Sequence, residues 1–225
     1  MPEKSSPFTR AIYDQFARIG KALSSGPRLE ILDLLCQGPR TVEALAREAG
    51  QSTANTSHHL HVLLGCRLVV AQKRGTRVTY RPADDRVCPF FQAFRRLAES
   101  RVLEIEEVTR RFLGDRGSMV PVDREALVSR VHNGEVIVLD VRPGEEYRAG
   151  HIPGSLSVPL DELEQRLAEI PRDGEVVAYC RGPYCVLAVE AVKMLRRHGY
   201  NAVRLEEGVP EWRERGLPVA GGCFP

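Results

Sequence analysis

Two cysteines lie close together in a short loop between a predicted strand and a predicted helix. Residues 176–179 form an apolar run rich in β-branched side chains, which is typical of a buried strand. Apolar residues near the helical period follow at 187–197. A loop that ends a strand and opens a helix directs backbone N–H groups to one point, and the helix dipole adds partial positive charge there. We therefore expect the first thiol, Cys180, to ionise readily and to act as a nucleophile. The loop consists of Cys180, Arg181, Gly182, Pro183, Tyr184 and Cys185.

Two kinds of covalent chemistry use a loop of this form. Cysteine-based phosphate or arsenate chemistry needs an arginine six residues after the nucleophile to clamp the oxyanion, and that position holds Val186. Sulfur transfer needs no such clamp, because the thiolate accepts a sulfur atom and becomes a persulfide. We expect Arg181 to help recruit an anionic donor such as thiosulfate. A purely structural pair of buried cysteines is the alternative, but Gly182 and Pro183 indicate a shaped turn.

Three motifs around this loop resemble those of rhodanese domains. The segments LDVRPGEEYRAGHIPGSLSVPL (139–160) and GVPEWRERGLPV (208–219) resemble the two flanking motifs, and YCRGPYC resembles the active-site loop. The resemblance implies a rhodanese-like α/β fold with a central parallel sheet and Cys180 as the persulfide carrier. Cys185 stands where many relatives carry a basic or hydroxyl residue. A second thiol there suggests that the persulfide is resolved as a Cys180–Cys185 disulfide, which would suit a sensor or a redox relay.

Length and charge indicate two regions with different partners. A chain of 225 residues with 43% hydrophobic and 28% charged residues has room for one or two globular domains. Residues 1–115 hold 18 Lys and Arg against 13 Asp and Glu, whereas residues 116–225 hold 14 against 17. The basic first half is therefore the half that we expect to meet nucleic acid. No apolar run reaches about 18 residues, and no signal-peptide core follows the first Met, so we expect a cytoplasmic protein without a membrane partner.

The first half has the pattern of a helix-turn-helix followed by a hairpin. Apolar stripes predict helices over 8–23 and 27–37, and Thr41 and Ser52 are suitable N-caps for helices that reach Gly50 and residue 64. Segment 68–82, LVVAQKRGTRVTYRP, alternates around Arg74-Gly75-Thr76 and predicts a β-hairpin with a basic tip. We expect DNA contacts from the polar face of the second motif helix and from this tip. These candidate residues are Thr53, Ser57, His58, His61, Lys73, Arg74 and Arg77.

This order of elements predicts a winged helix. The segments SGPRLEILDLL and TANTSHHLHVLL, together with the hairpin, resemble the ArsR family of bacterial transcriptional repressors over residues 10–112. The resemblance implies a homodimer that binds an inverted repeat in double-stranded operator DNA. It also implies a dimer interface made from the first helix and the helix after the wing. We expect that last helix to run without interruption over 88–113, with an apolar stripe that needs a partner.

These inferences predict three segments and several supporting residues. We expect a winged-helix domain over 1–113, a linker over 114–120 and a rhodanese-like domain over 121–225. Within the last, we expect helices over 123–132 and 161–170 and strands over 135–141 and 176–179. No metal is expected, since the histidines at 58 and 59 do not share a helix face, and no cofactor is expected. Asp140, Arg142, Glu146 and His151 are expected to be structural, and Cys36 and Cys88 are left open as a thiol pair.

The sequence therefore predicts a DNA-binding transcriptional regulator that carries sulfur on Cys180, with thiosulfate or polysulfide as donor. The first alternative is a working sulfurtransferase whose DNA binding is accessory. The second is an arsenate or phosphate enzyme, against which Val186 counts.

Overall fold

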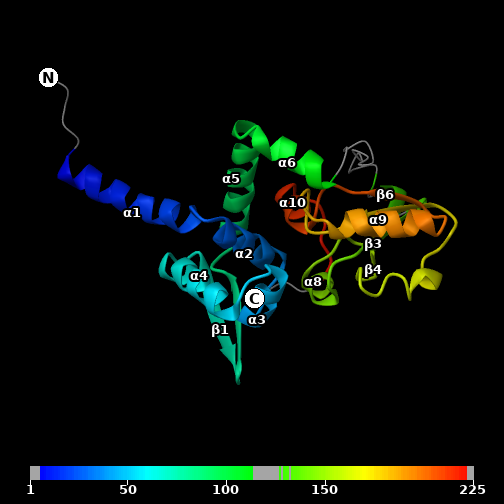
Figure 1. The fold of residues 1–225 in the computed structure, drawn as a ribbon, viewed down its shortest axis with the longest axis horizontal. Helices are drawn as coiled ribbons and strands as arrows, with labels where there is room; N and C mark the ends of the chain where they lie inside the picture. The colour runs from blue at the N-terminus through cyan, green and yellow to red at the C-terminus, as the bar shows by residue number, and fades with distance from the viewer. Residues whose placement is uncertain (1–5, 114–126, 128, 132, 222–225) are drawn as a thin grey trace. The chain divides into compact units, whose positions relative to one another are not determined.

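The computed structural model describes residues 6–113, 127, 129–131 and 133–221 (Figure 1). Residue contacts divide the chain into two compact units, Met1–Phe91 and Gln92–Pro225. The expected linker over 114–120 and much of the expected helix over 123–132 lie outside the described residues. Among the helices of the described part, none combines the length and apolar character needed to cross a membrane.

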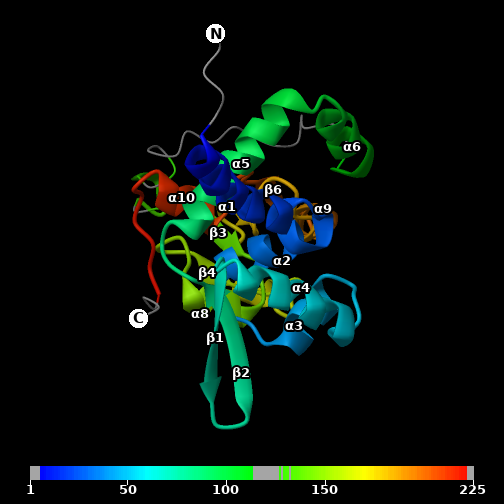
Figure 2. The same ribbon diagram turned by 90° about the vertical axis from the view of Figure 1, so that its left-hand side faces the viewer.

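The first unit has the predicted order of four helices and a hairpin. Leucine and isoleucine side chains from all four helices contribute to its core, and Ile31, Leu45 and Leu60 are fully buried there. The two strands pair antiparallel, and the hairpin extends away from the helices of its unit (Figure 2). The elements are α1 (Pro7–Leu23), α2 (Gly26–Gln37), α3 (Val42–Glu48), α4 (Thr53–Gly65), β1 (Val69–Arg74) and β2 (Arg77–Pro82).

Local signals in the sequence explain where the two motif helices begin. The Thr41 hydroxyl accepts a hydrogen bond from the backbone N–H of Ala44, and the Ser52 hydroxyl accepts one from Asn55. Between α3 and α4, Gly50 adopts a φ of +61°, which a side chain disfavours. The predicted N-caps of both helices are therefore confirmed.

The helix expected over 88–113 is wrong as a single element. The structure has α5 (Val87–Arg101) and α6 (Glu104–Leu113), and Val102 and Leu103 lie between them. Charge explains the break, because α5 ends on a basic residue and α6 opens with Glu104, Glu106 and Glu107 in its first turn. Each arrangement is favourable for the dipole of its own helix and stabilises two shorter helices.

The second unit contains the predicted parallel sheet, with strands in the order β4-β3-β5-β6. Alternate residues of the central strand β5 face opposite sides. Val176 and Ala178 pack with the helix α9, whereas Val177 and Tyr179 pack with Trp212 of the helix α10. The elements are β3 (Val136–Asp140), α8 (Gly144–Ala149), β4 (Leu156–Ser157), β5 (Glu175–Tyr179), α9 (Leu187–Arg197), β6 (Asn201–Arg204) and α10 (Val209–Glu214).

The amphipathic helix expected over 161–170 is also wrong. This segment forms a series of turns that ends in a short 3-10 helix, Leu167–Glu169. Most backbone hydrogen bonds here join residues three apart, such as Leu163 to Leu160, which is the 3-10 pattern. Ile170 directly precedes Pro171 and has extended backbone, with a φ of −91° and a ψ of 119°, as a residue before proline favours, so no α-helix continues to the end of this segment.

Candidate functional site

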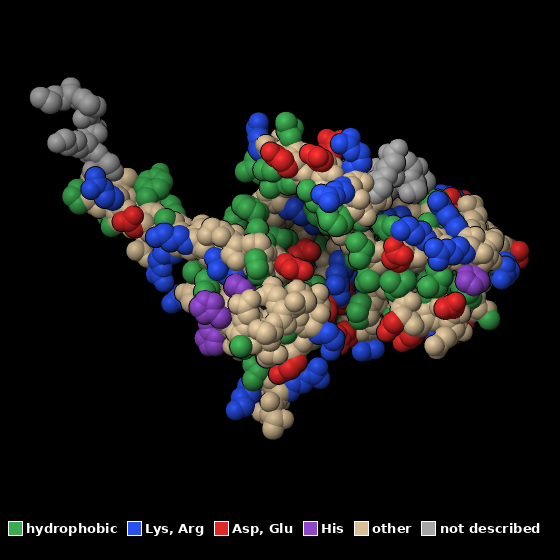
Figure 3. All heavy atoms as spheres, viewed as in Figure 1, with side chains coloured by type: hydrophobic (Ala, Val, Ile, Leu, Met, Phe, Trp, Pro, Cys, Tyr) green, Lys and Arg blue, Asp and Glu red, His purple; other side chains and the backbone are tan. Residues whose placement is uncertain are grey.

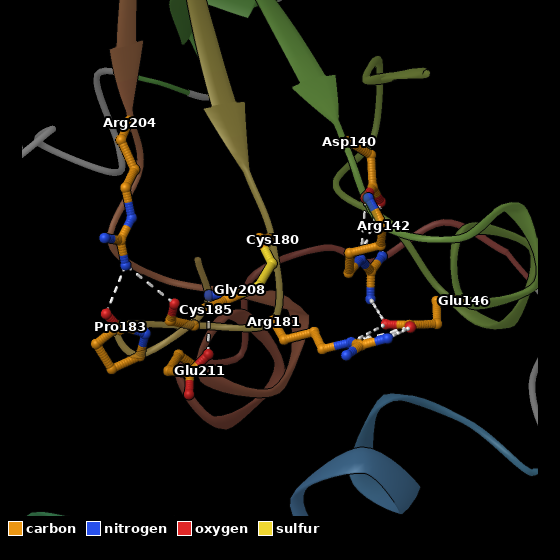
Figure 4. The surroundings of a disulfide bond; sticks show 11 residues. Asp140, Arg142, Glu146, Cys180, Arg181, Pro183, Cys185, Arg204, Gly208 and Glu211 are labelled. Atoms are coloured by element: carbon orange, nitrogen blue, oxygen red, sulfur yellow. Dashed lines mark hydrogen bonds and ion pairs between the residues drawn. A yellow bond between two sulfur atoms is a disulfide. The ribbon is translucent and has the colours of Figure 1, made fainter. Parts of the chain in front are cut away.

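The two thiols of the cysteine loop lie at the carboxyl edge of the parallel sheet. Cys180 follows β5 directly, and the segment Asp140–Arg142 ends β3 beside it, while Arg204 ends β6 on the other side (Figure 4). The carboxyl edge of a parallel sheet is the usual place for a binding site. Cys180 is 2% exposed and Cys185 is half-buried.

The structure joins Cys180 and Cys185 in a disulfide. Their Cα atoms lie 6.2 Å apart, within the range that a disulfide spans. Between them, the backbone N–H of Cys185 donates to the carbonyl of Gly182 over 3.2 Å, which closes a turn with Pro183 at its second position. This turn brings Cys185 back toward Cys180.

Two glycines allow the loop to take this form. Gly182 has a φ of +133°, a conformation that favours glycine. Gly208 lies so close to the loop that an added Cβ would stand 2.8 Å from the carbonyl oxygen of Cys180. Beside them, a Glu211 carboxylate oxygen accepts the N–H of Gly208 over 2.8 Å. The second rhodanese-like motif thus supports the loop by close backbone packing.

Arg181 does not stand ready for an anionic donor as expected. Its guanidinium donates to the carboxylate of Glu146 over 2.5 Å and 3.0 Å, and Glu146 is only 1% exposed (Figure 4). A neighbouring carboxylate neutralises the charge that was expected to attract thiosulfate. Glu146 therefore has a direct role in the geometry of the loop.

Asp140 and Arg142 form a buried ion pair with 0% exposure of either side chain. Burial would lower the pKa of Arg142, but the hydrogen bond and negative charge of Asp140 raise it above its usual value. The Tyr179 hydroxyl donates to Asp140 over 2.5 Å, and burial together with that carboxylate raises the pKa of Tyr179. Arg142 also donates to the carbonyl of Gly150. The contacts are those of residues that fix loops, which is the role that the sequence indicated.

Sequence reasoning missed Arg204. This residue is 3% exposed, and one guanidinium nitrogen donates to the carbonyls of both Gly182 and Pro183, over 3.2 Å and 2.5 Å. Figure 4 shows its side chain reaching from the end of β6 to the cysteine loop. An arginine in an otherwise apolar strand, NAVRL, was the available signal, because a buried charge needs partners.

The candidate DNA-contacting residues lie on α4 and at the tip of the hairpin. Thr53, His58 and His61 are exposed, whereas Ser57 is half-buried and its carbonyl bonds the His61 ring over 2.8 Å. Figure 3 shows histidine side chains gathered over α4 and basic side chains near the end of the hairpin. The basic residues of that tip, all exposed, are Lys73, Arg74 and Arg77.

A second disulfide lies within the first unit. Cys36 at the end of α2 is joined to Cys88 in the first turn of α5, with the Cα atoms 5.7 Å apart. The pair that the sequence left open is thus brought together. Cys66 is the free cysteine among the described residues, and its thiol contacts the carbonyl of Arg18.

The first unit is a winged-helix DNA-binding unit, because it has a helix-turn-helix followed by a basic hairpin. The second is a rhodanese-like domain, because its parallel sheet carries a cysteine loop at its carboxyl edge. The family model for bacterial regulatory proteins of the arsR family matches residues 25–70, and the model for the rhodanese-like domain matches residues 123–215. The chain is 44% identical to the HTH-type transcriptional regulator Rv0324 of Mycobacterium tuberculosis, over 95% of this chain and 93% of that protein. The chain belongs to this family of ArsR-type transcriptional regulators with a C-terminal rhodanese domain.

Other relatives match one of the two parts. A sulfurtransferase of Allochromatium vinosum is 35% identical over 100 residues, which cover 44% of this chain and 92% of that protein. Among solved structures, a homodimeric winged helix-turn-helix fragment from Mycobacterium bovis is 41% identical, with a TM-score of 0.41, and covers 45% of this chain and 94% of the fragment. A rhodanese-related protein of Thermoplasma volcanium is 31% identical, with a TM-score of 0.37, and covers 42% of this chain and 90% of that chain.

Proposed function

We propose that this regulator is a repressor that senses sulfane sulfur through the thiols of its rhodanese-like domain. The observation that carries the proposal is the position of Cys180 and Cys185, which are joined by a disulfide at the carboxyl edge of the sheet. One thiol at such a site suffices for transfer. A second thiol within bonding distance can displace the added sulfur from Cys180 and form the Cys180–Cys185 disulfide.

The proposed chemistry has two steps. The Cys180 thiolate attacks a sulfane sulfur: with hydrogen disulfide, HS–SH, a Cys180–S–SH persulfide forms and HS⁻ leaves. The Cys185 thiolate then attacks the inner sulfur of this persulfide, the Cys180–Cys185 disulfide forms, and a second HS⁻ leaves. The two cysteines lose two electrons in total, and the sulfane sulfur is reduced to sulfide.

On DNA, we propose that α4 lies in the major groove and that the hairpin tip contacts the backbone. The polar face of α4 carries short hydrogen-bonding and imidazole side chains, which suit base edges. The exposed Lys73, Arg74 and Arg77 suit phosphates. We propose a homodimer, because α1 exposes Phe8, Tyr13 and Phe16 by 64% or more, which is costly for a monomer in water.

The first unit offers a second place where oxidation would alter DNA binding. The Cys36–Cys88 disulfide ties the end of α2 to the start of α5. Since α2 packs in the same core as α4, a covalent bond at its end bears on the element proposed to enter the groove. We propose that DNA affinity differs between the dithiol and disulfide forms of the chain.

A working sulfurtransferase with accessory DNA binding is the second candidate. The similarity of the rhodanese-like part to the Allochromatium sulfurtransferase favours it. The pairing of Arg181 with Glu146 weighs against thiosulfate as the donor, because that arginine charge is already neutralised. The arsenate or phosphate enzyme has the least support, since Val186 occupies the position of the anion clamp.

The first test is intact-protein mass spectrometry with peptide mapping after treatment with polysulfide. We expect one added sulfur on Cys180 in the Cys185→Ser variant, and loss of two hydrogens linking Cys180 to Cys185 in the unchanged chain. Cys66→Ser is the matched control, because Cys66 forms no disulfide in the structure. No modification of either loop thiol in a folded, reduced protein would sink the proposal.

DNA affinity of the reduced and the polysulfide-treated protein separates the two candidates. A sensor changes its affinity on treatment, and the change is lost or reduced in Cys180→Ser. An enzyme with accessory DNA binding keeps its affinity and shows thiosulfate:cyanide turnover that Cys180→Ser abolishes and Cys185→Ser retains.

A further inference from the structure

The contacts of Arg204 give this buried residue a task at the cysteine loop. Its guanidinium spans the carbonyls of Gly182 and Pro183, the first two residues of the turn that leads to Cys185. Glu211 and Gly208 support the loop from the side of α10, whereas Arg204 holds these two carbonyls from the end of β6. We propose that Arg204 is a positioning residue that keeps Cys185 within bonding distance of Cys180.

The direction of the peptide groups explains how Arg204 acts. A peptide unit is planar, so fixing its carbonyl also fixes the N–H on the opposite side. Holding the Pro183 carbonyl toward β6 sets the Pro183–Tyr184 peptide, which is the centre of the turn. Holding the Gly182 carbonyl sets the acceptor for the Cys185 N–H, 3.2 Å away. The two hydrogen bonds of Arg204 together determine the position of Cys185.

The position of Arg204 on the sheet makes this anchor rigid. Arg204 is the last residue of β6 and pairs with Ala178 of β5, two residues before Cys180. Leu205 donates its N–H to the carbonyl of Ala178 over 2.9 Å, so the backbone around Arg204 is fixed to the strand that leads directly to Cys180. The Arg204 side chain therefore fixes the position of the turn relative to the end of β5.

This inference rests on the proposed resolving role of Cys185 and names the residue that makes it efficient. Without Arg204 the two carbonyls lose a charged donor in a buried place, and the turn gains freedom. Cys185 then spends less time near Cys180, and the disulfide becomes less favourable relative to the two thiols.

The test is the thiol–disulfide equilibrium of each pair in the full chain. Protein dithiol and oxidised dithiothreitol exchange to protein disulfide and reduced dithiothreitol, and acid quenching, alkylation and peptide mass mapping separate the Cys180–Cys185 pair from the Cys36–Cys88 pair. In Arg204→Met, which keeps the apolar stem, we expect the equilibrium constant of the loop disulfide to fall about tenfold. In Arg204→Lys the same equilibrium constant should fall by a smaller factor, because the lysine ammonium keeps a charged donor but reaches the two carbonyls less well.

Two controls give the experiment its specificity. The Cys36–Cys88 pair is measured in the same molecules and should keep its constant. Arg196→Met is the matched variant, because Arg196 donates to the carbonyl of Ala202 in the same strand over 2.8 Å but makes no bond to the loop. It should leave both constants at the wild-type value.

An unchanged loop constant in Arg204→Met overturns the proposal, and so does an equal fall in both pairs, which would mean general loosening. If Arg204→Met does not fold, Arg204→Lys decides, and a wild-type constant there overturns the proposal. If the unchanged protein forms no Cys180–Cys185 disulfide, the resolving step of the proposed function fails and this inference falls with it.

Discussion

At the scale of single residues, charge compensation controls the cysteine loop. Arg181 meets Glu146, and Arg142 meets Asp140, so each of these two cations has a carboxylate oxygen within 2.6 Å. Buried charges of this kind are stable only as pairs. The arginines nearest Cys180 in the sequence and at the end of β3 are therefore paired with carboxylates, and their positive charges are largely compensated.

Asp140→Asn should strongly destabilise the second unit. The change leaves the fully buried Arg142 without its main counter-charge, and removing one partner of a buried pair costs about 3–5 kcal/mol of unfolding free energy. Urea unfolding measures this loss. Lys193→Met is the matched control, because its pair with Glu190 is exposed and should contribute little. Equal, small effects in both variants would contradict a structural role for Asp140.

The sequence was sufficient to locate the thiol loop but not the side-chain partners around it. Cys180 and Cys185 follow from their spacing and from the strand before them, because both are local features. The partners of Arg181 and Arg204 come from residues 35 and 22 positions away, and no local pattern encodes such a pairing. For this reason the sequence does not show that Arg181 pairs with Glu146 instead of recruiting an anionic sulfur donor, nor that Arg204 reaches the loop.

At the scale of elements, the hairpin presents its basic residues without cover from the rest of its unit. The side chains of Lys73, Arg74 and Arg77 are all exposed near the turn. Since a phosphate contact releases counterions, such an element should bind DNA in a salt-dependent way with little regard to sequence. The polar face of α4 should instead determine which sequence is bound.

Arg74→Ala and Arg77→Ala should weaken DNA binding for all sequences and flatten its salt dependence. The slope of log affinity against log salt should fall by roughly one for each lost phosphate contact. Fluorescence anisotropy at several salt concentrations measures the slope. His58→Ala should change sequence preference instead, and Lys193→Ala, exposed in the other unit, should change neither. A wild-type slope in both wing variants would place the hairpin away from the DNA backbone.

Phe16→Glu should convert the proposed dimer to a monomer. Phe16 is 64% exposed on α1 and forms a ring contact with Tyr13, so a charge there disrupts an apolar face without disturbing a core. Sedimentation velocity reports the oligomeric state, and affinity for an inverted repeat should fall in parallel. Gln15→Glu on the same helix adds a charge outside this pair and is the control. A dimer that persists in Phe16→Glu would exclude α1 from the interface.

Element boundaries were predictable where caps define them and not where charges or prolines divide a periodic pattern. Thr41 and Ser52 gave the starts of α3 and α4 because their hydroxyls bond the backbone three residues on. The helical spacing of the stripe expected over 88–113 continues from Leu97 through Arg101 to Ile105, so periodicity alone could not show that the helix breaks between them. Over 161–170 the amphipathic pattern likewise predicts an α-helix, whereas the structure has 3-10 turns.

At the scale of the whole molecule, two disulfides offer two separate places to receive an oxidising signal. One lies in the cysteine loop of the second unit and the other joins α2 to α5 in the first. The sequence predicted both folds through their local motifs. It left open the pairing of Cys36 with Cys88, because 52 positions separate them and closeness across that span depends on the folded core.

Cys36→Ser should show which disulfide controls DNA binding. If oxidation of the first unit controls DNA binding, the change in DNA affinity after polysulfide treatment disappears in Cys36→Ser. It persists in the control Cys66→Ser, because Cys66 forms no disulfide in the structure. Electrophoretic mobility shift with reduced and treated protein measures this. A full response in Cys36→Ser, together with loss in Cys180→Ser, would assign control to the cysteine loop.

The bond between Cys36 and Cys88 also encloses α3, α4 and both strands of the hairpin in one covalent ring. In the oxidised protein the segment proposed to contact DNA is a closed loop of chain, whereas α1 lies outside it. Closing a ring of this size restricts the unfolded chain, which in the loop-entropy account favours the folded form by roughly 4 kcal/mol. Amide hydrogens inside the ring should therefore exchange more slowly after oxidation, and those of α1 should not.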